Sequence, residues 1–332
     1  MAADFGQNIS LSQLRIHRKI YLAWSLRPML RSGKRFIAVL ILIAVTGSVT
    51  SVLESEAAFG AGQAPVNWSF YEYGSSNANM HTLGCNQAQY DNGVGHNSFV
   101  ILDFGAMYDS AGDQINFSGQ VQTPAKVGQL GENFALGYTD CGPRFRVTIA
   151  IGTNNSRQLT YAEGQAFANT VNVIRTWVNG NASHVAVWGA NDIESWGGGG
   201  ISPTQTYNWY NGYAASNGPT YVNFGSADGC PQNTSGSCSY GWGQGDYYNL
   251  SWRETLAFAA PEIYVYPNNP VQALQWAYIS SYGAPFAGQI SPMGPLDEND
   301  LDPSTNSPTA AWNQLQFFLS GSVYSMEMHT TT

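Results

Sequence analysis

Two carboxylates follow an apolar segment near the middle of the chain. Residues Val185–Ala190 lead directly into Asp192 and Glu194, which are separated by one residue. In an extended chain both side chains point the same way. Adjacent carboxylates resist simultaneous ionisation, so one of the two pKa values should rise. A general acid that protonates a glycosidic oxygen near neutral pH needs such a raised pKa, and we therefore predict Glu194 as the acid and Asp192 as its partner. The alternative is that both are solvated loop acids or charges at a helix N-terminus.

Other polar and aromatic residues fall near predicted strand ends or in loops. Glu262 is a candidate second catalytic carboxylate, although it follows Pro261 and falls early in its predicted strand, at the end away from an active site. Tyrosine and tryptophan offer flat apolar faces with a polar edge, which suits sugar rings. The predicted substrate-binding residues are Asp103, Trp188, Trp196, Asp228, Trp252, Tyr264 and Gln289. The alternative is that the aromatic residues belong to the core and the acids are ordinary loop residues.

Eight short β-branched or aromatic segments predict the strands that would position these residues. Several are apolar on both faces, which is typical of a parallel sheet covered by helices. The segments are 68–73, 99–104, 146–151, 185–189, 221–224, 248–252, 262–266 and 287–290.

Helix signals lie between these strands. Thr160 and Glu163 form a capping box, and a cap residue before proline predicts helices at Ser202-Pro203, Asn269-Pro270 and Ser307-Pro308. Residues 74–143 are rich in Asn and Gly and predict long loops without a clear helix.

This alternation of strands and helices favours an α/β fold. Eight strands in about 270 residues predict a (β/α)8 TIM barrel, somewhat irregular in its N-terminal third. A doubly wound open sheet is the second choice, because the glycine-rich phosphate turn that usually follows its first strand is missing.

The N-terminal residues 1–58 read as an export segment. Basic residues up to position 35 precede an apolar run at Phe36–Val45 and then small residues, with cleavage expected near Ala57 or Ala58. An uncleaved signal anchor at 36–53 is the alternative. We expect a secreted protein, or a membrane-anchored one with its body outside, and a single domain over 59–332.

Four cysteines agree with an oxidising compartment, although free buried thiols are the alternative. Cys230 and Cys238 predict a local loop disulfide, which leaves Cys85 with Cys141.

The charge of the body and the absence of several motifs exclude other functions. After residue 58 there are 6 Lys and Arg against 19 Asp and Glu, giving 6 − 19 = −13, so nucleic acids and anionic membranes are disfavoured as partners. Membrane contact is expected only through 36–53. There is no G-x-S-x-G, no P-loop, no HExxH and no metal-ligand spacing of histidines, so no cofactor and no metal are expected.

The Asp-x-Glu sequence after the fourth strand resembles the barrel glycosidase superfamily. It is similar to the end of the Asp-x-x-Asp-x-Asp-x-Glu motif of family 18 chitinases, whose general acid falls on Glu194 and whose preceding Asp falls on Asp192. The two earlier Asp positions are Ala190 and Val187 here. In that family the substrate's N-acetyl group serves as nucleophile. Family 25 lysozyme-like barrels also place acids at these strand ends, and Val185–Gly294 resembles a group of secreted bacterial proteins of unassigned function.

These observations predict an exported glycoside hydrolase that acts on a cell-wall or environmental polysaccharide, with a carbohydrate as its ligand or substrate. A non-catalytic carbohydrate-binding or surface protein on the same fold is the alternative, and a structural envelope protein is a third possibility.

Overall fold

A parallel sheet with helices on its outer face forms the framework of the structure. The computed structural model describes residues 67–72, 74–157, 159–195, 201–232, 236–253, 257–263, 270–282, 296–297, 306–319 and 328–331. All of them belong to the unit Ala64–Thr332. The predicted export segment lies outside the described residues. Within those residues, no helix is long and apolar enough to cross a membrane.

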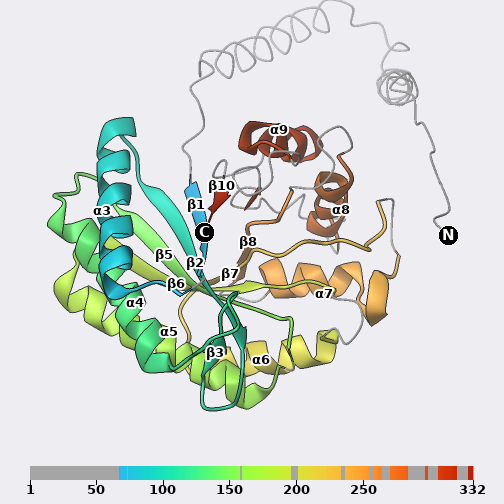
Figure 1. Cartoon of the computed structure of the whole chain (residues 1–332). Coiled ribbons are helices and arrows are strands. Elements are labelled where there is room, and N and C mark those ends of the chain that lie inside the picture. The colour runs from blue at the N-terminus through green and yellow to red at the C-terminus, as the bar shows by residue number, and fades with distance from the viewer. Residues whose placement is uncertain are drawn as a thin grey trace, which may run out of the picture. The chain divides into compact units, whose positions relative to one another are not determined.

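Eight strands of the sheet run parallel and follow chain order around it (Figure 1). Their order is β8-β7-β6-β5-β2-β1-β10-β9, and every neighbouring pair is parallel. A short antiparallel hairpin, β3–β4, is attached to β2. The strands are β1 Asn67–Tyr71, β2 Ser98–Met107, β3 Gln114–Ile115, β4 Val121–Gln122, β5 Val147–Asn154, β6 Val185–Asp192, β7 Tyr221–Asn223, β8 Ala257–Ala259, β9 Leu296–Asp297 and β10 Met328–Thr331.

The α/β class is confirmed, whereas closure into a barrel is not seen in the described residues. The chain order would become a ring if β8 paired with β9, but the pairing described for the sheet ends at these two strands.

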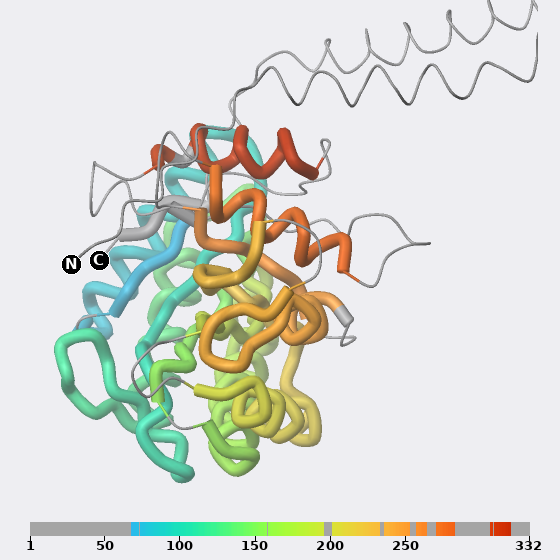
Figure 2. The backbone as a smooth tube through the Cα atoms, turned by 90° about the vertical axis from the view of Figure 1, so that its right-hand side faces the viewer, coloured from blue at the N-terminus to red at the C-terminus, as the bar shows by residue number. Residues whose placement is uncertain are grey.

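Helices pack on the outer face of the sheet. Figure 1 shows α3, α4, α5 and α6 following one another around the strands, while α7, α8 and α9 lie on the other side. Figure 2 faces the side that carries α7 and α8. The helices are α3 Asn77–Val94, α4 Pro124–Asp140, α5 Tyr161–Asn181, α6 Pro203–Ala215, α7 Gln244–Tyr248, α8 Val271–Ser280 and α9 Pro308–Phe318.

The two faces of the sheet have different cores. The outer face and the helices share a large cluster that includes Val100, Ile149 and Phe167. The inner face carries a smaller cluster formed by Phe99, Ile101, Ala150, Ala190, Val222, Phe224 and Ala260. Because side chains alternate along a strand, the odd-numbered residues of β2 and the even-numbered residues of β6 share the inner face.

The helix starts predicted at Thr160, Ser202 and Ser307 are confirmed. Thr160 and Glu163 form the capping box at the start of α5, with Glu163 N to Thr160 Oγ1 at 3.2 Å. Ser202 and Ser307 cap α6 and α9. At α8 the cap position is Pro270 instead, and Asn269 lies outside the described residues.

The prediction that residues 74–143 lack a clear helix was wrong. Ser76 caps α3, and Thr123 caps α4. The apolar pattern of α3 is weak because several of its buried residues are polar or small. Gly84 lies against α4 so closely that an added Cβ would come 2.0 Å from the Phe134 carbonyl oxygen. Helix α3 is therefore held by close backbone packing against α4. It lacks the apolar stripe by which an amphipathic helix is predicted from sequence.

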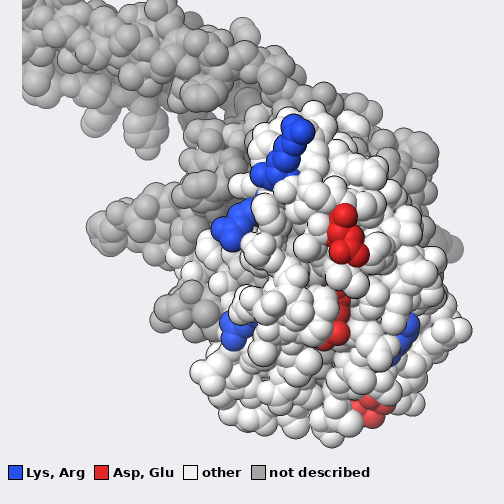
Figure 3. Space-filling view, turned by 90° about the vertical axis from the view of Figure 1, so that its left-hand side faces the viewer, with Lys and Arg blue, Asp and Glu red and all other residues white. Residues whose placement is uncertain are grey.

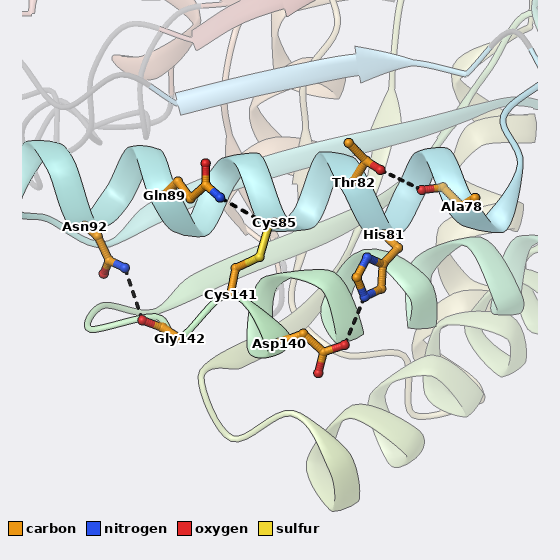
Figure 4. Close-up of a disulfide and its surroundings, with 9 residues drawn as sticks. All are labelled: Ala78, His81, Thr82, Cys85, Gln89, Asn92, Asp140, Cys141 and Gly142. Atoms are coloured by element: carbon orange, nitrogen blue, oxygen red, sulfur yellow. Dashed lines mark hydrogen bonds and ion pairs between the residues drawn. A yellow bond between two sulfur atoms is a disulfide. The ribbon is translucent and has the colours of Figure 1, made fainter.

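Both predicted disulfides form, and the described residues contain no free cysteine. Cys85 on α3 bonds Cys141, which caps the end of α4 (Figure 4). Nearby on the same two helices, His81 Nε2 lies 2.9 Å from Asp140 Oδ2. Cys230 bonds Cys238 in the loop after β7. Two disulfides are compatible with an extracellular protein.

One predicted strand is helical, one is displaced along the chain, and one lies outside the described residues. Residues 248–252 form the end of α7 and a π-helical turn, Asn249–Arg253, because Asp246 Oδ2 accepts from the Gly243 N–H and starts a helix there. The strand predicted at 262–266 is found earlier in the chain, as β8 Ala257–Ala259, so that Glu262 follows it; residues 264–266 lie outside the described residues. Residues 287–290 lie outside the described residues.

Candidate active site

Three carboxylates meet at the carboxyl ends of the strands. One oxygen each of Asp192, Glu194 and Glu262 lies within 4.8 Å of the other two. Asp192 ends β6, Glu194 follows it by two residues, and Glu262 follows β8. The sequence suggested that Glu262 lies at the start of its strand, away from the site. In the structure it lies after the end of β8, on the same side as the other two acids. The side chains of Asp192 and Glu262 are buried, and that of Glu194 is half-buried.

Mutual repulsion shapes the chemistry of this group. Two unit charges about 5 Å apart repel by about 3 kcal/mol at the effective dielectric constant of a protein site. Three carboxylates at this spacing favour a form in which one of them holds a proton. Such a group can donate a proton from one carboxyl while another stays negatively charged.

Two asparagines hold the backbone of the Asp192–Ser195 segment. The Asn155 amide accepts from the Glu194 N–H at 3.0 Å and donates to the Glu194 carbonyl at 2.8 Å. On the other side, Asn223 Oδ1 accepts from the Ile193 N–H at 3.4 Å. Asn223 was not predicted as a site residue, because it lies inside the predicted strand 221–224.

Tyr71 joins Glu262 from the opposite part of the sheet. Its hydroxyl donates to Glu262 Oε1 at 3.2 Å. Strands β1 and β8 lie five steps apart in the sheet order. In a flat sheet five steps cover about 24 Å, which is too far for a tyrosine and a glutamate to bridge. The sheet is therefore strongly curved, and its inner face is concave around the carboxylates.

Tyr247 lies beneath the same segment from α7. It is completely buried. Burial raises the pKa of Tyr247 above its ordinary value of 10, and the negative charge of Glu194 adds to that rise. Tyr247 therefore stays a neutral phenol beside the acids.

Asp103 lies on the inner face of β2, just before a shift in register with β5, and pairs with Tyr71 on β1. Its Oδ1 accepts from the Gly105 N–H at 2.9 Å, and its Oδ2 has no hydrogen-bond partner among the described residues. Burial raises the pKa of Asp103 to about 7. Because the side chain is 0% exposed, its position favours a role inside the sheet over direct contact with a ligand.

The remaining predicted ligand-binding residues occupy varied positions. Asp228 lies close to the acids, since its carbonyl accepts from Ser195 Oγ at 2.8 Å. Trp188 stacks on Phe258 at 5.7 Å between ring centroids. It lies four residues before Asp192, or about 13 Å along the strand. Trp252 packs edge-on against a core tryptophan at 5.9 Å. Trp196, Tyr264 and Gln289 lie outside the described residues.

Comparison with known proteins adds no family assignment. No family model matches the chain, and no curated protein matches it significantly.

Proposed function

We propose that this chain is an exported glycoside hydrolase built on a (β/α)8 barrel and acting on a polysaccharide. The observation that carries the proposal is the meeting of Asp192, Glu194 and Glu262 within 4.8 Å at the carboxyl ends of parallel strands. Active sites of such barrels are built at that end. The cyclic strand order and the Tyr71–Glu262 hydrogen bond support closure of the sheet.

Glu194 serves as the general acid, because it is the most exposed of the three carboxyls and can reach a leaving-group oxygen. Asp192 and the two asparagines hold it in place. Glu262 supplies the second carboxylate, as the sequence suggested despite its expected position early in a strand, and Tyr71 orients it.

The spacing favours retention of configuration. Retaining glycosidases hold their two carboxyl groups about 5–5.5 Å apart, whereas inverting enzymes need about 6.5–9.5 Å to admit a water. In the retaining scheme Glu194 gives its proton to the glycosidic oxygen while a Glu262 oxygen bonds to the anomeric carbon. Water, deprotonated by Glu194, then displaces Glu262 and leaves the sugar with its original configuration.

The net charge of the body narrows the substrate class. Figure 3 shows the face formed by α3, α4 and α5 as largely uncharged, with separate acidic and basic groups. The body as a whole is acidic, which disfavours polyanionic glycans. A neutral or amino-sugar polysaccharide fits these properties.

The test is release of reducing ends from a panel of cell-wall and plant polysaccharides. Wild type should cleave at least one of them, and Glu194→Gln and Glu262→Gln should each lower kcat by about a hundredfold or more. Glu132→Gln on the outer helix α4 is the matched control and should retain full activity. Full activity of Glu194→Gln, or loss of activity in EDTA with recovery on adding a divalent cation, would contradict the proposed roles.

A further inference from the structure

Tyr240 is an exposed aromatic residue in a backbone conformation that tyrosine rarely adopts. Its φ is 54°, in the left-handed region, and its side chain is 64% exposed. A bulky residue at positive φ is strained, and here the ring gains little packing in return. Glycine would fit this position better. A tyrosine at this position does not serve the stability of the fold, and its exposed ring points to a role in binding.

The segment that carries Tyr240 is fixed on several sides. The Cys230–Cys238 disulfide closes two residues before it. The Ser239 N–H donates to the Gly229 carbonyl at 3.1 Å, and the Cys238 N–H donates to the Trp242 carbonyl at 2.8 Å. The ring of Tyr240 is therefore presented from a rigid support, which lowers the entropy lost when it binds a partner.

This support adjoins the segment that carries Glu194. The buried ring of Trp242 packs on Tyr247 at 5.0 Å between centroids, and Tyr247 lies beside Glu194. Ser195 Oγ bonds the Asp228 carbonyl at 2.8 Å, at the start of the same loop. Tyr240 therefore belongs to a loop that contacts the Glu194–Ser195 segment, through the Asp228 carbonyl and through the Trp242–Tyr247 pair.

Two other exposed tyrosines, Tyr108 and Tyr282, have local explanations. The Tyr108 ring has the Arg157 guanidinium 5.5 Å from its centroid. The Tyr282 ring packs on Tyr248 at 6.1 Å. Neither residue has positive φ.

We propose that Tyr240 is a stacking platform for one sugar ring of the polysaccharide, at a position away from the bond that is cleaved. The inference rests on the proposed function. A phenol ring matches the C–H face of a sugar, and its hydroxyl can meet the sugar's own hydroxyls. The platform predicts a preference for long chains, because short substrates would fill only the cleavage position.

The experiment measures binding and stability together. The dissociation constants of polysaccharides and of oligosaccharides of increasing length are measured for the Glu194→Gln variant. The same constants are measured for the double variants that add Tyr240→Gly or Tyr240→Phe. Tyr240→Gly should weaken binding of long chains by about tenfold. Its Tm should stay close to that of the parent, because relief of the strained φ offsets the entropy that glycine adds to the unfolded chain. Tyr240→Phe should keep most of the affinity. Asn217→Gly is the matched control, since Asn217 also has a φ of 54° but lies just after α6, and its binding should not change.

The outcomes separate this inference from the proposed function. Unchanged binding by Tyr240→Gly, or a large fall in its Tm, overturns the platform even if wild type cleaves the glycan. Weaker binding by Tyr240→Gly to a glycan that wild type never cleaves supports the platform and overturns the hydrolase. No binding of any glycan overturns both.

Discussion

Asp103 should make the stability of this protein fall as the pH rises through the slightly acidic range. Burial raises the pKa of Asp103 from 3.8 to about 7 in the folded protein. Between these values the folded state holds a proton that the unfolded state has released. Stability therefore decreases with rising pH, by about 1.4 kcal/mol per pH unit. The full effect is about 4 kcal/mol, reached near pH 7, and the contribution is constant at higher pH.

The test compares wild type with Asp103→Asn by urea unfolding from pH 4 to pH 8. Asparagine cannot ionise, so the variant lacks this contribution at every pH. Any change that the amide itself brings to the free energy of unfolding is the same at every pH. The difference in that free energy, variant minus wild type, should therefore rise by about 4 kcal/mol from pH 4 to pH 8.

Asp113→Asn is the control, since its side chain is partly exposed and lies outside the sheet. Its stability relative to wild type should change little over this range. If wild type and Asp103→Asn differ in free energy of unfolding by the same amount at pH 4 and at pH 8, the reasoning is refuted. Asp103 would then be hydrated or paired in the folded protein.

Two further predictions test the site and the loops. Tyr71→Phe removes the hydrogen bond to Glu262 and should lower kcat about tenfold with little change in KM, since a hydrogen bond to a charged group contributes about 1.5–3 kcal/mol; an unchanged kcat would show that Tyr71 does not orient this carboxylate. The Cys85–Cys141 disulfide closes 56 residues and the Cys230–Cys238 disulfide closes 8. Replacing each pair by alanine should cost about 4 and about 2.5 kcal/mol of unfolding free energy, and equal costs in urea unfolding would contradict a loop-entropy origin.

The sequence predicted the elements that depend on local chemistry. The capping box at Thr160 and the caps at Ser202 and Ser307 are short-range patterns, and each was found where expected. The apolar strand predicted at 185–189 was found as β6, Val185–Asp192. The two disulfides followed from a simple spacing argument in a chain with four cysteines.

The sequence failed where packing replaced apolar periodicity. Helix α3 buries Gln87 and Asp91, which read as loop residues along the chain. In the fold the Asp91 carboxylate accepts hydrogen bonds from Ser98, Tyr138 and Gln87 at 2.7–2.8 Å. These partners come from other elements or from one turn away, so a single sequence window cannot show that the polar groups are satisfied.

The chain itself determined that Asp192 and Glu194 leave a buried strand together, because the two-residue period of a strand is a local property. The tertiary structure alone decided that Glu262 joins them and that Tyr71 reaches Glu262 from five strands away. That meeting depends on where β8 ends and on how far the sheet curves. Both follow from side-chain packing on the two faces of the sheet, which is summed over many distant residues and leaves no local pattern in the sequence.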